Sequence, residues 1–174
     1  MIHYRKKLKM KIEQLRSCID LEKKEWINKH ATNCYAYALG LDIPQSKINK
    51  YAYTPGIISN SSIYLPSSED IDYEDLINNI YLDLKTLGID FKEIEPTDKI
   101  NSNEWKIAIF IAKSYGKIFD YHFLRQHSDG TWYHKNGFSG DISNYDFQGQ
   151  IITNPKECYI PCRTYKKCLS LKLK

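Results

Sequence analysis

No stretch of this chain approaches the ~20 consecutive apolar residues that a transmembrane helix needs. Residues 1–21 are basic but contain no apolar run, so they lack the pattern of a secretory signal. Internal repeats, low-complexity tracts and linker-like segments are also missing. We therefore expect one domain over residues 1–174, cytoplasmic as synthesised and without membrane association, although delivery outside by a non-classical route stays open.

Cysteine is scarce and irregularly placed. The chain has five cysteines: Cys18, Cys34, Cys158, Cys162 and Cys168. An odd and scattered set does not form a disulfide framework. The spacing of the last three is not a standard zinc spacing, and no histidine lies near them. We therefore expect no metal and no cofactor.

Charge of one sign is not in great excess, since the net charge is only +4. Motifs of the zinc-finger, RRM and KH types are absent, so we expect no nucleic acid partner. Apolar residues make up 42% of the chain and charged residues 26%, which is typical of a globular protein rather than a disordered one.

Helices are predicted in the first half of the chain. Apolar residues recur at helical spacing over residues 4–26, which predicts an amphipathic helix within an N-terminal segment 1–28. A second helix is predicted over 69–87, capped by Ser67 or Ser68 and ended by Gly88. The intervening region 41–66 is predicted to be a long loop, and such loops are often functional.

Strands are predicted in the second half. We expect strands over 91–95 and 105–113, then a hairpin of 118–126 with 131–136, and edge pieces at 147–152 and 159–160. Helices followed by an antiparallel meander predict an α+β fold, with helices packed on a small antiparallel sheet. Residues 30–140 would form its core and residues 141–174 a C-terminal extension.

The segment 30–40 (HATNCYAYALG) is the most informative part of the sequence. Thr32 or Asn33 is a good helix N-cap and Gly40 can end the helix, which places Cys34 in the first turn. The free N–H groups and partial positive charge of a helix N-terminus favour a thiolate, and the thiolate is the nucleophilic form of cysteine.

The predicted hairpin supplies candidate bases. A three-residue loop over 128–130, with Gly130 in the left-handed region, places His134 opposite Leu124. His122, His134 and Asn136 then share one face of the ribbon. A two-residue turn would instead place His122 and His134 on opposite faces. His127 lies in the turn and is expected to be exposed.

A cysteine and a histidine make a catalytic pair when a third polar group holds the imidazole. His122 is the predicted base for Cys34, and either His134 or Asn136 could orient it. The oxyanion of an acyl-transfer intermediate would be held by the backbone N–H of Cys34 and an upstream donor such as His30 or Asn28.

The motif NCYAYA at 33–38, with His122 and a second histidine twelve residues later across an Asp-Gly turn, resembles the NlpC-type branch of the papain-like cysteine peptidases, to which the CHAP amidases are related. This resemblance implies a papain-like fold. It also implies Cys34 as the nucleophile, His122 as the general base and His134 as the orienting residue.

The leading prediction is a cysteine hydrolase that cleaves an amide or isopeptide bond through an acyl-thioester. Its expected partner is a peptide or peptidoglycan-fragment substrate. The same residues could serve an acyltransferase or a deamidase of the toxin or effector type. A further alternative is a non-catalytic binding module on a degenerate papain-like scaffold, because fold does not fix function.

Overall fold

The structure is a computed structural model that describes residues 33–41, 54–59, 72–137 and 140–174, together with positions 13, 16 and 19. The predicted N-terminal helix, most of the predicted loop over 41–66, and the candidate residues Asn28 and His30 lie outside the described residues.

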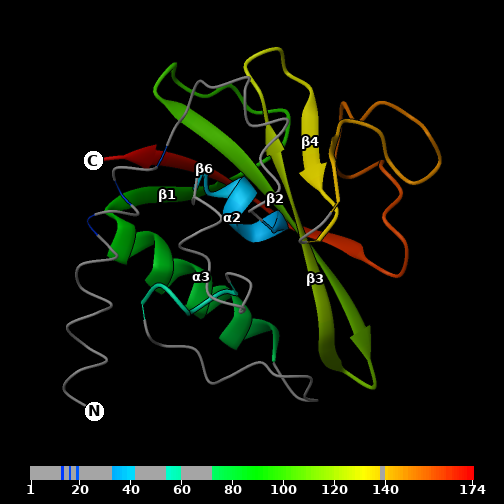
Figure 1. Ribbon diagram of the computed structural model, residues 1–174, viewed down its shortest axis with the longest axis horizontal. Helices are drawn as coiled ribbons and strands as arrows, with labels where there is room; N and C mark the ends of the chain where they lie inside the picture. Colours follow the sequence, from blue (N-terminus) through cyan, green and yellow to red (C-terminus); the bar gives the residue numbers. More distant parts are fainter. Residues whose placement is uncertain are drawn as a thin grey trace.

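Within the described ranges, six antiparallel strands form one sheet in the order β1-β6-β2-β3-β4-β5 (Figure 1). The strands are β1 (Ile89–Ile94), β2 (Glu104–Ser114), β3 (Lys117–Gln126), β4 (Trp132–Lys135), β5 (Ile142–Ser143) and β6 (Thr164–Leu173). Helices α2 (Cys34–Ala38) and α3 (Tyr73–Leu87) precede them in the chain. The predicted α+β class is confirmed.

The predicted strands over 91–95 and 105–113 correspond to β1 and β2. The turn between β2 and β3 consists of Tyr115 and Gly116, whose φ angles are 49° and 82°. Positive φ at both positions of a two-residue turn matches the right-handed twist of the flanking strands. The predicted edge pieces form only isolated bridges, Tyr145 with Ile151 and Ile160 with Arg163.

Strand β6 was not predicted from the sequence. Its residues belong to the predicted C-terminal extension, yet it lies between β1 and β2 in the interior of the sheet. Leu169 and Leu171 are fully buried, but Lys167 interrupts the apolar pattern before them. Lys167 is paired with Glu93 of β1 at 2.7 Å. The sequence shows Lys167 as a charged residue but does not show that Glu93 of another strand pairs with it, so the segment does not read as an interior strand.

Helix α3 has the predicted apolar stripe, and all five predicted residues are buried: Leu76, Ile77, Ile80, Leu84 and Leu87. Gly88 ends the helix in the left-handed region with φ of 70°, as predicted. The helix begins later than predicted, because Asp72, and not Ser67 or Ser68, is its N-cap.

The two faces of the sheet carry separate cores. One face packs against α2 and α3, and its buried side chains include Ile107, Ile109, Ile111, Phe123, Leu169 and Leu171. The other face is covered by the segment 144–160, and its core consists of Ala108, Phe110, Leu124, Trp132, Ile152, Ile160 and Cys168. Figure 1 shows α2 in front of the central strands and the segment after β4, in orange, beside β4 on the side away from β1.

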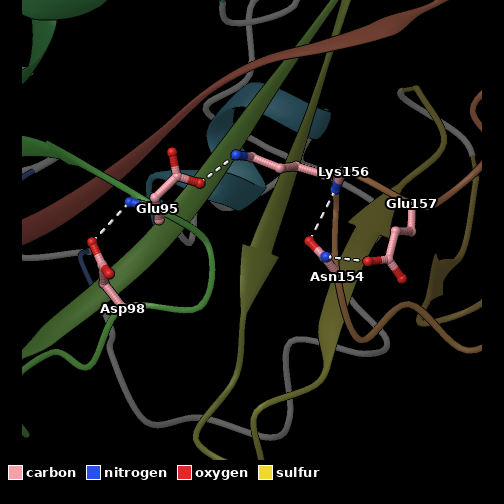
Figure 2. A network of polar contacts seen from close by, with 5 residues as sticks. All are labelled: Glu95, Asp98, Asn154, Lys156 and Glu157. Carbon is pink, nitrogen blue, oxygen red and sulfur yellow. Dashed lines mark hydrogen bonds and ion pairs between the residues drawn. The ribbon is translucent and has the colours of Figure 1, made fainter.

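Polar contacts fasten this covering segment to the end of β1 (Figure 2). Lys156 forms an ion pair with Glu95, whose backbone N–H donates to Asp98 at 2.9 Å. The side chain of Asn154 accepts from the backbone N–H of Lys156 at 3.1 Å and donates to Glu157 at 2.7 Å. Of these contacts, the Lys156–Glu95 ion pair joins the two segments, and the others order the chain on either side of it. All are exposed, so each adds little stability.

In the part of the chain that the structure describes, no helix combines the length and apolar character required to cross a bilayer.

Candidate active site at the start of helix α2

Cys34 is the first residue of α2, as the sequence predicts. The side-chain Oδ1 of Asn33 accepts the backbone N–H of Ala36 at 2.9 Å, which makes Asn33 the N-cap. Gly40, with φ of 75°, follows the helix and lets the chain turn away. All five residues of α2 are buried.

Two tyrosines of α2 fix the helix in place. The hydroxyl of Tyr35 donates to Asp83 of α3 at 3.0 Å, and this fully buried carboxylate also accepts the N–H groups of Gly56 and Ser59, each at 2.7 Å. Burial raises the pKa of Asp83, whereas these hydrogen bonds lower it. Asp83 was not singled out in the sequence, where it is one of several acidic residues in an amphipathic helix.

Tyr37 links the other side of α2 to the hairpin turn. Its hydroxyl lies 2.6 Å from Nε2 of His127. The expectation that His127 is exposed was therefore wrong: the ring is partly buried, and burial lowers its pKa to about 4. A turn residue is exposed by default, but here α2 covers the turn.

The thiol of Cys34 lies where β4 separates from β3. The described pairing of these strands stops at Leu124 with His134, and the next N–H along β3, that of Phe123, hydrogen-bonds to the Cys34 sulfur. The N–H of Tyr35 contributes a second hydrogen bond. The sulfur thus lies against the backbone of β3, just beyond the last described pair of β3 with β4.

The backbone N–H groups at the helix start favour a thiolate, as the sequence indicates, but the burial of Cys34 opposes it. Burial raises the pKa of the Cys34 thiol to about 11, because desolvation outweighs the two backbone N–H groups that favour the charged form. Cys34 is only 7% exposed. Its resting state is therefore the neutral thiol.

The hairpin has the predicted register. Leu124 pairs with His134, and the N–H of His127 donates to the carbonyl of Thr131 at 2.9 Å across the predicted three-residue loop. His122 and His134 consequently lie on the same face of the sheet. Nε2 of His122 is 2.9 Å from Nδ1 of His134.

A backbone carbonyl determines which nitrogen of each ring carries the proton. Nε2 of His134 lies 2.9 Å from the carbonyl oxygen of Tyr145, and because a carbonyl can only accept, this nitrogen is the donor. Nδ1 of neutral His134 is then an acceptor, so Nε2 of His122 donates to it. This leaves Nδ1 of His122 without a proton, as a base.

Both histidines are held neutral. Burial, together with the nearby His134 and Arg163, lowers the pKa of His122 to about 3. Burial also lowers the pKa of His134, against the Tyr145 carbonyl and the side chain of Asn136, whose hydrogen bonds raise it. The pair is therefore uncharged at neutral pH, with one free lone pair on His122.

Cys34 and His122 approach from opposite faces of β3. Phe123 packs against Tyr35 of α2, with ring centroids 4.9 Å apart, so its neighbour His122 points to the other face. Among the described residues, the Cys34 sulfur and the His122 ring form no direct hydrogen bond; the sulfur is hydrogen-bonded to the backbone N–H groups of Phe123 and Tyr35.

Asn136 belongs to this cluster through His134, on which its side chain acts. Asn136 is also the residue whose carbonyl accepts the N–H of Gly140 at 3.0 Å. Within the described ranges, no group of three or more His, Cys, Asp or Glu side chains is arranged to hold a metal ion.

Sequence reasoning missed two charged residues of the site, Asp120 and Arg163. They form an ion pair, and both charges act on the Cys34 thiol. Arg163 precedes β6, the strand that was not predicted, so nothing in the local sequence connects it with the histidines.

Comparison of the chain with family models, with curated proteins and with solved structures finds no match.

The buried histidines predict a loss of stability in acid. The pKa of His122 is about 3 in the folded chain and about 6.5 in an unfolded one, so between these values the unfolded chain binds more protons. The free energy of unfolding should therefore fall as the pH is lowered from about 6.5, by up to about 1.4 kcal/mol per pH unit for each such group.

Urea unfolding at a series of pH values measures this effect. The variant His122→Gln lacks one of the titrating groups, so its stability should depend less steeply on pH than that of the unmodified chain. Parallel curves for the two proteins would contradict the burial of a neutral His122.

Proposed function

We propose that this chain is a cysteine hydrolase of amide or isopeptide bonds, with Cys34 as nucleophile, His122 as general base and His134 as orienting residue. The observation that supports it most is the hydrogen-bond chain from the Tyr145 carbonyl through His134 to His122. It leaves Nδ1 of His122 as the basic nitrogen of the pair. The resemblance of the Cys and His motifs to NlpC-type peptidases is consistent with this arrangement.

The proposed reaction begins with a neutral pair. Nδ1 of His122 takes the proton of the Cys34 thiol as the sulfur attacks the substrate carbonyl carbon, and a C–S bond forms. The resulting oxyanion collapses, the C–N bond breaks, and the His122 imidazolium returns its proton to the leaving amine. Water, activated by His122, then cleaves the acyl-thioester and releases the acid.

The pKa values of Cys34 and His122 determine the order of proton transfer and attack. With the thiol pKa near 11 and the His122 pKa near 3, proton transfer must accompany attack rather than precede it. A substrate that displaces water and brings its carbonyl to the sulfur supplies the driving force. The N–H groups of Phe123 and Tyr35, which already face the sulfur, would stabilise it as the leaving group when water cleaves the acyl-thioester.

The proposed substrates are peptides or peptidoglycan fragments, as the family resemblance implies. An acceptor amine in place of water would make the same residues an acyltransferase. The papain-like topology belongs to the proposal too, because helix α2 against a sheet with the histidines on β3 and β4 is consistent with it.

The burial of Cys34 favours a second candidate, a non-catalytic module in which the cysteine is a small core residue. Its 7% exposure and raised pKa are typical of structural cysteines. The two candidates differ in the reactivity of this thiol toward an acyl donor.

Trapping the acyl-enzyme tests the proposal. The chain is mixed with p-nitrophenyl acetate, quenched in acid and digested for mass spectrometry. Cys34 should carry one acetyl group at early times, and His122→Ala should acquire it far more slowly, because no base takes the thiol proton. The exposed Cys162 is an internal reference for unassisted reaction. Equal acetylation of Cys34 in both proteins would favour the binding module.

A further inference from the structure

An arginine stands beside the histidines on the same face of the sheet. Thr164 of β6 pairs with Ile111 of β2, so the preceding residue, Arg163, reaches the level of Ala112. Asp120 of β3 pairs with Ala112 from the other side. Arg163 therefore spans the small side chain of Ala112 to form its ion pair with Asp120.

This ion pair adjoins the catalytic candidates. Asp120 and His122 are two residues apart on β3, so their side chains share a face about 7 Å apart. The charge of Arg163 acts on both the Cys34 thiol and the His122 ring, lowering the pKa of each. Arg163 is thus a cation close enough to influence both the Cys34 thiol and the His122 ring.

The guanidinium of Arg163 is only partly satisfied. One terminal nitrogen pairs with Asp120, and the other donates to the carbonyl of Pro161 at 3.1 Å. The Nε–H is buried and has no hydrogen-bond partner. A buried donor without a partner costs free energy, so native proteins rarely keep one without a reason. A ligand that accepts from Nε would supply the missing hydrogen bond.

We propose that Arg163 binds a carboxylate of the substrate beside the scissile bond, so that the chain acts on acidic peptides. This inference rests on the proposed hydrolase function. The planar fork of Nε–H and a terminal N–H fits the two oxygens of a carboxylate. The single positive charge of the guanidinium suits one carboxylate, which takes the place of Asp120. Asp120 occupies part of the fork in the free protein and is the competitor that the substrate carboxylate displaces.

Equilibrium binding to the Cys34→Ala variant tests this without requiring catalysis. The probes are N-acetyl-glutamyl-alaninamide and its neutral analogue N-acetyl-glutaminyl-alaninamide, measured by calorimetry. The acidic peptide should bind about tenfold more tightly or better, because a hydrogen bond between charged groups is gained. Adding Arg163→Gln should remove the preference, and adding Asp120→Asn should increase it.

The matched control is Lys117→Gln, which also loses an ion pair with an aspartate, Asp72, but on the outer part of β3. It should leave the preference unchanged. If Arg163→Gln does not fold, the Asp120→Asn result decides, since it leaves the arginine in place. Equal affinities for the two peptides, or binding of neither, would overturn the inference.

The outcome is separable from that of the proposed function. Acetylation of Cys34 that depends on His122, together with equal peptide affinities, would leave the hydrolase standing and remove the acidic subsite. If the acidic peptide is preferred through Arg163 but Cys34 is not acetylated, the site binds an anion and the hydrolase function is removed.

Discussion

Replacing Cys34 by alanine or serine is expected to abolish turnover while the chain keeps its fold. Loss of a covalent nucleophile typically reduces kcat on the order of 10⁶-fold. The structural cost is smaller, about 1 kcal/mol, because only one buried atom is removed or exchanged. A serine hydroxyl can still accept the N–H of Phe123 but is a far weaker nucleophile at this site. Ester turnover and urea unfolding, measured on the same preparations, separate the two effects.

Cys168→Ala is the matched control for this change. Cys168 is also a buried thiol with a raised pKa, near 12, but it lies in the core on the opposite face, away from α2. Its loss should cost similar stability and leave turnover unchanged. A soluble, folded Cys34→Ala protein with normal turnover would remove Cys34 from the mechanism.

Local signals made the arrangement of the main site residues predictable. Asn33 as the cap, Gly40 as the helix end, and the three-residue loop before Thr131 each follow from the preferences of a few consecutive residues. The hairpin register then places His122 and His134 on one face, because strand side chains alternate. The structure confirms each of these steps.

The remaining features depend on contacts between distant segments. Strand β6 is interior because it pairs with both β1 and β2, and its Lys167 forms an ion pair with Glu93 of β1. Asp83 is buried because Tyr35, Gly56 and Ser59 converge on it from elsewhere in the chain. No local pattern reports such partners.

The protonation of the site could not be predicted for the same reason. The helix N-terminus is visible in the sequence and favours a thiolate, but the desolvation that opposes it depends on everything packed around Cys34. The tautomer of His122 depends on the backbone carbonyl of Tyr145, and a carbonyl is present at every residue. Which carbonyl lies against His134 is therefore decided by the fold and not by the local sequence.

Replacing His134 by alanine is expected to lower turnover on the order of 10²-fold without abolishing it. The variant keeps Cys34 and His122 but loses the acceptor for Nε2–H of His122, which is 2.9 Å away. The imidazole of His122 can then protonate on either nitrogen and rotate, so less of it presents a basic Nδ1 to the thiol. The effect should fall on kcat rather than KM, because His134 acts through His122.

Two further variants decide between His134 and Asn136 as the orienting residue. Asn136→Ala should reduce turnover less than His134→Ala, because Asn136 acts on His134 and not on His122. His134→Gln should recover part of the lost activity, because its amide oxygen can accept the Nε2–H of His122. Recovery should be incomplete, because the variant lacks the imidazole that also bonds to the Tyr145 carbonyl. Near-normal turnover of His134→Ala together with strongly reduced turnover of Asn136→Ala would assign the orienting role to Asn136. Full activity of both variants would mean that the hydrogen bonds from the Tyr145 carbonyl through His134 do not orient His122 as the base.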